Sequence, residues 1–255
     1  MPSSEIPQSD SDPAVRVESA RFGFEGALLF DGLELALERG RWTCLLGPSG
    51  VGKSSLLRVI AGLERLESGS LSVPSGTSIA YMAQQDLLMP WLSALGNVSL
   101  GARLRGEKPD RDRALAMLER VGLAGEADAL PRTLSGGMRQ RVALARTLME
   151  DRPIVLMDEP FSALDAITRA RLQELAAGLL AERTVLLVTH DPLEALRLGE
   201  RIYVMAGRPA SLQHAPAPDS PPPRRLGDRS LQALHAELLE RLTAADEAGA
   251  DARPH

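Results

Sequence analysis

The chain has little of several features that mark well-known classes of protein. Its 255 residues include one cysteine, Cys44, so a disulfide framework is excluded, and we expect a buried, reduced thiol in a cytosolic compartment. No segment approaches the about 18 consecutive apolar residues that span a bilayer. Residues 1–12, rich in Pro, Ser and Asp, do not resemble a secretory signal. We therefore expect a soluble chain that reaches a membrane only through a partner.

Aromatic side chains and net positive charge are also scarce. Aromatic residues make up 3% of the chain, which leaves Leu, Val, Ala and Ile, within an apolar content of 44%, to fill the core. The formal net charge is −5, whereas a general nucleic-acid binder carries a basic face, so we expect no nucleic-acid partner. The length allows one large domain or two small ones.

Glycine, by contrast, is concentrated where it carries chemistry. Residues 47–54 read Gly-Pro-Ser-Gly-Val-Gly-Lys-Ser and fit Gly-x-x-x-x-Gly-Lys-Ser/Thr, a loop whose backbone N–H groups cradle nucleotide phosphates. Its glycines allow backbone angles that a Cβ forbids, Lys53 supplies a charge to the phosphates, and Ser54 supplies a hydroxyl ligand for Mg²⁺. The apolar strand Trp42–Leu46 before it and a helix predicted over 55–63 after it complete an arrangement that favours anion binding.

A second glycine-led helix start lies at residues 134–141, which read Leu-Ser-Gly-Gly-Met-Arg-Gln-Arg. Apolar residues recur behind it with the period of one helix face, and Ser135 stands as the N-cap. These apolar residues are Met138, Val142, Ala145 and Leu148. The next apolar run, Ile154–Glu159, ends in two carboxylates. Such a run is typical of a parallel strand buried on both faces, with its acidic tip at the ligand-binding edge of the sheet.

In kind and order these motifs resemble those of the ATP-binding subunit of an ABC transporter. The resemblance covers roughly residues 14–207 and includes six motifs in the family's order. They are the Walker A loop (Gly47–Ser54), the Q-loop glutamine (Gln84), the signature (Leu134–Arg141), Walker B (Ile154–Glu159), the D-loop (Ser162–Asp165) and the switch histidine (His190). Chance agreement of six ordered motifs is negligible.

The resemblance implies the fold class and the division of the chain. The fold is expected to be α/β, an ABC-type P-loop ATPase with a mixed central sheet, an antiparallel β subdomain and a helical subdomain. The expected parts are a disordered N-terminus (1–13), the ATPase cassette (14–207, its helical subdomain about 87–150), a proline-rich linker (208–227) and a C-terminal helix and tail (228–255). Because every motif precedes Gly207, we expect hydrolysis to survive removal of residues 210–255.

The C-terminal helix has its own apolar pattern. Leucines at every third or fourth position line one of its faces, and a face of this kind needs to be buried. They are Leu231, Leu234, Leu238 and Leu242.

The resemblance also implies roles for individual residues. Asp158 would hold Mg²⁺ through water with Ser54 and Gln84, Glu159 would orient or deprotonate the attacking water, and His190 would contact the γ-phosphate. ATP and Mg²⁺ are the expected cofactors. The residues expected at ATP are Phe22, Gly47, Pro48, Ser49, Gly50, Val51, Gly52, Lys53, Ser54, Ser55, Gln84, Ser135, Gly136, Gly137 and Asp165.

Two of these assignments keep an alternative. Gln84 directly ends the strand predicted at 78–82 and has the family's spacing to Trp91, so we prefer it to Gln85. Phe22 is the preferred platform for stacking on adenine, and Phe24 is the alternative, since a phenylalanine in this place is also plausible core.

Two departures point to one branch of importers. Met138 stands where the commoner signature has Gln. A methionine at this position, and the run Leu87–Trp91, are similar to the ATP-binding subunits of importers of sulfonates, taurine, nitrate and pyrimidine precursors. The sequence of residues 81–86 resembles the corresponding segment of importers of hydroxymethylpyrimidine, a thiamine precursor. An exposed apolar patch at 87–91 would suit docking of a membrane subunit's cytoplasmic helix.

The implied function is the ATP-hydrolysing, energy-coupling subunit of an importer of a small molecule. Two chains would sandwich two ATP molecules, each between the Walker loops of one and Ser135–Gly137 of the other. The implied partners are this second copy, integral membrane permease subunits and a periplasmic or surface substrate-binding protein, with the chain peripheral on the cytoplasmic face of the inner membrane.

Two alternatives remain, a soluble ABC ATPase of DNA repair or translation and a nucleotide-dependent regulator without turnover. Lys53 and Asp158 lie too close in the sequence for the long coiled coil of repair members, and translation members carry two cassettes where this chain has one. The intact Glu159 and His190 disfavour the regulator.

Overall fold

The computed structural model describes residues 12–24 and 26–250. The expected disordered N-terminus falls almost entirely on residues 1–11, and the end of the expected tail falls on 251–255, which both lie outside the described residues. No helix within the described ranges is long and apolar enough to cross a membrane.

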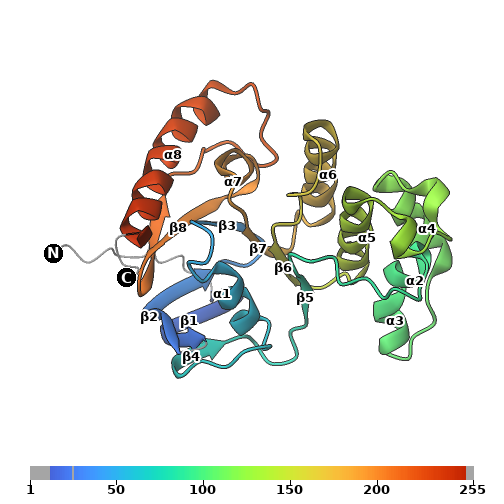
Figure 1. Cartoon of the computed structure of the whole chain (residues 1–255), viewed down its shortest axis with the longest axis horizontal. Coiled ribbons are helices and arrows are strands. Elements are labelled where there is room, and N and C mark those ends of the chain that lie inside the picture. Colours follow the sequence, from blue (N-terminus) through green and yellow to red (C-terminus); the bar gives the residue numbers. More distant parts are fainter. Residues whose placement is uncertain (1–11, 25, 251–255) are drawn as a thin grey trace.

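A nine-stranded mixed sheet runs through the molecule in the order β4-β1-β2-β9-β8-β3-β7-β6-β5 (Figure 1). The strands are β1 (Val15–Phe24), β2 (Ala27–Leu37), β3 (Trp42–Leu46), β4 (Ser68–Ser72), β5 (Ile79–Met82), β6 (Ile154–Asp158), β7 (Thr184–Val188), β8 (Arg201–Gly207) and β9 (Ala210–Ala215). The five strands β8, β3, β7, β6 and β5 are mutually parallel, and β1 pairs antiparallel with β2 and β4. This confirms the expected mixed sheet with an antiparallel part.

The three central strands are buried along their whole length because helices cover both faces of a parallel sheet. Every residue of β3, β6 and β7 is buried, as their continuous apolar runs predict. The carboxyl ends of parallel strands meet at one edge of the sheet. The phosphate loop follows β3, Glu159 follows β6 and His190 follows β7, so the topology gathers these three sites at that edge.

Eight α-helices and two short 3₁₀ turns lie among the described residues. The helices are α1 (Lys53–Ile60), α2 (Ala94–Val98), α3 (Leu100–Leu104), α4 (Arg111–Arg120), α5 (Gly136–Met149), α6 (Ala166–Leu179), α7 (Pro192–Leu198) and α8 (Arg229–Ala250). Helices α2 to α5 stand together at one end of the molecule (Figure 1). Arg141 of α5 closes this group by donating to the carbonyl oxygens of Val121 at 3.2 Å and Gly122 at 3.1 Å, just beyond α4.

The structure corrects the start of the predicted linker. Ala210–Ala215 form β9, which pairs antiparallel with β8 and contacts β2 through Phe30 and Ala210. The prolines misled the prediction because Pro209 lies in the turn before the strand and Pro216 just after it, so neither removes a hydrogen bond from the ladder. Removing residues 210–255 would take a strand from between β2 and β8, so the expectation that hydrolysis survives this truncation no longer follows.

The C-terminal helix α8 packs on β8 and α7 (Figure 1). Its predicted leucine face is the face that the cassette buries: Leu231 and Leu238 are fully buried, and Leu234 and Leu242 are partly buried against the same core.

Candidate functional site

The phosphate loop takes a shape that only glycine allows at three positions. Gly47, Gly50 and Gly52 have φ angles of 153°, 76° and 116°, in the region that L side chains rarely adopt. A Cβ on Gly47 would also lie 2.5 Å from the carbonyl oxygen of Met205. The loop leads directly into α1, so the first N–H groups of that helix face the space that the loop encloses.

Lys53 is the cation of this loop. Its side chain is 7% exposed, and its Nζ donates to the carbonyl oxygens of Gly47 at 2.7 Å and Pro48 at 2.8 Å. Burial lowers the pKa of Lys53, and the nearby carboxylates of Glu159 and Asp158 oppose that effect. The ammonium group is therefore held by neutral carbonyls, which a phosphate oxygen would outcompete as an acceptor because its bond is charge-assisted.

Asp158 and Ser54 come together between the end of β6 and the start of α1. Asp158 is 3% exposed, and burial raises the pKa of its carboxyl group, while a hydrogen bond with the Ser54 side chain opposes the shift. A desolvated carboxylate beside a hydroxyl group is a set of oxygen donors that suits Mg²⁺. Within the described part of the chain, no group of three or more His, Cys, Asp or Glu side chains is placed to hold a metal ion.

Glu159 and His190 face each other across the strand ends. The Nδ1 atom of His190 lies 3.1 Å from Oε2 of Glu159. Glu159 has a φ angle of 49°, and its N–H donates to the carbonyl oxygen of Val188 at 2.9 Å. A non-glycine residue in this region stores backbone strain, and such strain concentrates at functional sites. The arrangement brings together a carboxylate and an imidazole that follow the neighbouring strands β6 and β7.

Gln140 is a residue of the site that the sequence analysis missed. It is 6% exposed on α5, and its Nε2 donates to the carbonyl oxygen of Glu159 at 2.9 Å. Its Oε1 accepts a hydrogen bond from the N–H of Ala163 at 2.8 Å. The signature helix thus holds the backbone on both sides of the turn that follows Glu159. Helical periodicity gives no signal for it, because a buried amide in an apolar helix looks the same in sequence as an exposed one.

The signature residues form the N-terminus of α5. Ser135 is the N-cap, and its Oγ accepts from the N–H of Met138 at 3.3 Å, as the sequence predicted. Ser135 and Gly136 are exposed to solvent. Gly137 is partly buried, and a Cβ there would lie 3.1 Å from the carbonyl oxygen of Ala163, so this glycine permits close packing on the D-loop.

The sequence profile of the ABC transporter family matches residues 30–162, more than half of the chain. The chain belongs to this family. An ABC transporter ATP-binding protein of Haemophilus influenzae, itself uncharacterized, is 45% identical, over 89% of this chain and 98% of that protein. An aliphatic sulfonates import ATP-binding protein of Rhodococcus jostii is 47% identical, over 85% of this chain and 88% of that protein. An aliphatic sulfonates import ATP-binding protein of Pseudomonas syringae pv. syringae is 43% identical, over 94% of this chain and 99% of that protein.

Solved structures agree with this assignment. An ATP-binding cassette seen as a dimer in a post-hydrolysis state, bound to ADP and phosphate, has a TM-score of 0.73 and 29% identity to this chain. The match covers 81% of this chain and 100% of that cassette. The ABC fold expected from the motifs is thereby confirmed. This chain keeps both Walker motifs, so it shares the ATPase activity of the family.

The Q-loop of this ABC cassette is tied to the signature helix. Arg139 Nε lies 2.9 Å from Oδ2 of Asp86, and Arg146 donates to the carbonyl oxygens of Asp86 at 2.8 Å and Leu87 at 2.9 Å. These three contacts join the loop to α5. Gln84 and Gln85 both follow β5 and are both exposed, so the structure does not choose between them.

The structure corrects the preferred adenine platform of the cassette. Phe22 is 4% exposed, and its ring stacks on that of Phe30 with the centroids 5.6 Å apart. A ring enclosed in the core has no free face for a base. Phe24, the alternative, is 46% exposed at the end of β1.

Asp165 of the D-loop has a local structural role. It is the N-cap of α6, and its Oδ1 accepts from the N–H groups of Thr168 at 3.0 Å and Ile167 at 3.1 Å. The hydrogen bond from Thr168, and to a smaller extent that from Ile167, holds the pKa of Asp165 below its usual range. A part in ATP binding stays a prediction for this residue.

Proposed function

We propose that the chain is the ATP-hydrolysing subunit of an ABC importer, which couples hydrolysis to the uptake of a small molecule. The observation that supports it most directly is the Glu159–His190 pair, 3.1 Å apart, at the sheet edge that also carries Lys53, Ser54 and Asp158. A phosphate-binding loop beside a carboxylate and an imidazole is the set of groups that phosphoryl transfer to water requires.

Each of these residues has a distinct part in hydrolysis. The loop amides and Lys53 bind the phosphates, Glu159 orients or deprotonates the attacking water, and His190 contacts the γ-phosphate. Ser54, Asp158 and Gln84 would hold Mg²⁺, which supplies charge neutralisation on the phosphates when it is bound. The exposed ring of Phe24 is the platform on which the adenine stacks.

The active form is a dimer in which the signature of one chain completes the site of the other. The exposure of Ser135 and Gly136 supports this, because neither is covered within its own chain. The solved cassettes of this fold were also seen as dimers. Ser135–Gly137 of each chain then face the nucleotide held by the partner, and the pair closes on ATP and reopens after hydrolysis.

A membrane permease docks beside the Q-loop. Leu87 and Trp91 are 53% and 72% exposed, and such large apolar side chains on a surface mark an interaction site. Arg139 and Arg146 of the signature helix bond Asp86 and Leu87. Helix α5 would therefore couple a permease helix on this surface to the nucleotide site. The chain then lies on the cytoplasmic face of the inner membrane and works with a substrate-binding protein outside it.

The transported molecule is an aliphatic sulfonate or a related small molecule of the same branch. Relatives named as aliphatic sulfonate importers are 43–47% identical over most of the chain, which favours a sulfonate over hydroxymethylpyrimidine. The permease and the binding protein select this molecule, so the cassette itself has no site for it.

The test of hydrolysis is Glu159→Gln. We expect ATP binding to be retained and kcat to fall by roughly 10²–10⁴, because the base is lost while the phosphate loop is intact. The trapped ATP should then hold two chains together, which gel filtration with ATP measures. Glu182→Gln, at an exposed carboxylate, is the matched control and should hydrolyse ATP normally. A monomeric Glu159→Gln with bound ATP would contradict the dimer model.

A mixing experiment tests the contribution of the second chain. Ser135→Arg should bind ATP but not turn it over, and Lys53→Ala should fail to bind ATP because it loses the cation of the loop. In a mixed dimer one composite site carries both changes and the other carries neither. Partial recovery of ATPase activity is expected. No recovery in proven mixed dimers would rule out that Ser135 acts on the partner's nucleotide.

A further inference from the structure

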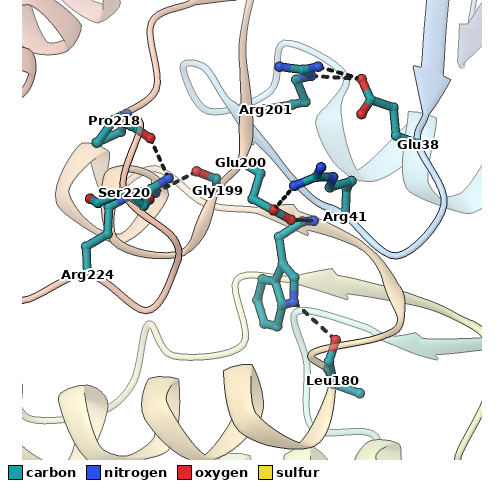
Figure 2. Close-up of polar contacts among 10 residues, drawn as sticks. Glu38, Arg41, Leu180, Gly199, Glu200, Arg201, Pro218, Ser220 and Arg224 are labelled. Atoms are coloured by element: carbon teal, nitrogen blue, oxygen red, sulfur yellow. Dashed lines mark hydrogen bonds and ion pairs between the residues drawn. The ribbon is translucent and has the colours of Figure 1, made fainter. Parts of the chain in front are cut away.

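The segment that joins the sheet to α8, residues 216–228, is fastened to the cassette by one buried side chain. Arg224 is 4% exposed, and its guanidinium group donates to four backbone carbonyl oxygens. Figure 2 shows Arg224 beside Pro218, Ser220 and Gly199. The acceptors are Ser220 at 2.6 Å and Pro218, Leu196 and Gly199, each at 2.7 Å. The N–H of Arg224 also donates to the carbonyl oxygen of Arg197 at 3.0 Å.

Three of these acceptors belong to the C-terminal end of α7. The last carbonyl groups of a helix have no partner within it, and a cation is favoured at that end. The C-cap residue of α7 is Gly199, and Arg224, 25 residues further along the chain, supplies the donors for the carbonyl groups at this end. A Cβ on Gly199 would lie 2.8 Å from the carbonyl oxygen of Ala195 and 2.9 Å from the Cys44 Sγ, so this glycine lets the end of α7 pack closely against β3.

The other end of α7 is part of the catalytic site. The helix begins two residues after His190, and its N-cap Asp191 accepts from the N–H of Leu193 at 2.9 Å. One turn later, Oε1 of the buried Glu194 accepts from Nε2 of Gln173 on α6 at 2.8 Å. Helix α7 is thus bonded to α6 through Glu194 and Arg197, and Arg224 bonds the carbonyl groups at its end.

We infer that Arg224 is a positioning residue for hydrolysis, which acts through α7 on the place of His190 relative to Glu159. The inference rests on the proposed function, in which His190 contacts the γ-phosphate. Loss of the Arg224 side chain leaves the carbonyl groups of Leu196 and Gly199 at the buried end of α7 without this donor, so we expect the helix to shift. A misplacement of about 1 Å in a catalytic group costs up to 10²-fold in rate. The phosphate loop follows β3 and takes no part in the Arg224 contacts, so ATP binding should not change.

The test compares Arg224→Gln with Arg225→Gln, a change at the exposed neighbouring arginine. We expect kcat of Arg224→Gln to fall about tenfold, with the KM for ATP unchanged within about twofold. The Cε1–H resonance of His190, assigned by comparison with His190→Gln, should shift in Arg224→Gln. Arg225→Gln should keep both kcat and this resonance. A merely structural role would lower the melting temperature and leave the His190 resonance of the folded variant in place.

Wild-type kcat, or an unmoved His190 resonance, in a folded Arg224→Gln would overturn the inference. If that variant does not fold, Arg224→Lys replaces it, since it keeps the charge but carries its donors on one nitrogen. An ammonium group has three N–H donors on one nitrogen and can replace at most three of the four bonds, so we expect about a threefold loss of kcat. Wild-type kcat in Arg224→Lys would equally overturn the inference. If the unmodified chain hydrolyses no ATP, the proposed function fails, and the His190 resonance alone then decides the positioning role.

Discussion

Replacing Gln140 by alanine should slow hydrolysis without touching any residue that contacts ATP. Gln140 bonds the carbonyl oxygen of Glu159 at 2.9 Å and the N–H of Ala163 at 2.8 Å. The Glu159 carbonyl keeps a second donor, the Ser162 hydroxyl at 3.0 Å, whereas the N–H of Ala163 loses its side-chain partner. Ala163 is exposed, so water replaces part of that bond. The net loss of stability should therefore be about 1–2 kcal/mol, at the lower end for a lost partner.

Two measurements follow from this value. The melting temperature should fall by about 2–8 °C for a chain of this length. The turnover rate should fall roughly tenfold, which corresponds to about 1.4 kcal/mol of activation free energy, because the strained backbone that carries Glu159 loses a fixed hydrogen bond. The assays are thermal denaturation by circular dichroism and steady-state phosphate release at saturating ATP.

Two further variants isolate the cause. Gln140→Met keeps the volume without the amide, so it should lose activity as Gln140→Ala does while losing less stability. Gln232→Ala, at an exposed glutamine of α8, should match the wild type in both assays. A folded Gln140→Ala with wild-type kcat would show that the signature helix does not hold the Glu159 turn.

Two other outcomes test the packing of α8 and the adenine platform. Leu238→Ala should cost about 2–5 kcal/mol in urea denaturation because Leu238 is fully buried. Leu239→Ala, at a side chain 44% exposed, should cost less than about 0.5 kcal/mol, and equal costs would mean that α8 is not packed as described. Phe24→Ala should weaken ATP binding by about 1–3 kcal/mol in a nucleotide titration, the usual value of a stacked base. Unchanged affinity would exclude Phe24 as the platform.

Local sequence patterns predicted the catalytic edge well. The apolar run Trp42–Leu46 predicted β3 with its correct ends, and the run Ile154–Glu159 predicted β6, which ends one residue earlier at Asp158. Both predictions worked because a strand buried on both faces needs an unbroken run of apolar residues. The Asp191-Pro192 pair starts α7 for an equally local reason, since a cap and a proline act within one turn. Once these strands are parallel, their ends meet at one edge.

Contacts between distant segments were outside the reach of such patterns. Phe22 and Phe24 look equivalent in sequence, but the pairing of β1 with β2 brings Phe22 against Phe30 and leaves Phe24 exposed. Proline density hid β9, because the pattern does not tell a proline that flanks a strand from one that interrupts it.

The sequence by itself determined the chemistry of this protein. Its glycines, Lys53, Asp158, Glu159 and His190 specify phosphate binding and hydrolysis through residue type and order along the chain. Only the tertiary structure decided how that chemistry is held in place, by Gln140 behind Glu159 and by Arg224 at the end of α7. The physical reason is that a buried amide or guanidinium group is recognised by the backbone carbonyls that it meets. Those carbonyls come from segments that only folding brings together. Every residue has a backbone carbonyl, so the sequence does not show which donor a given carbonyl will meet.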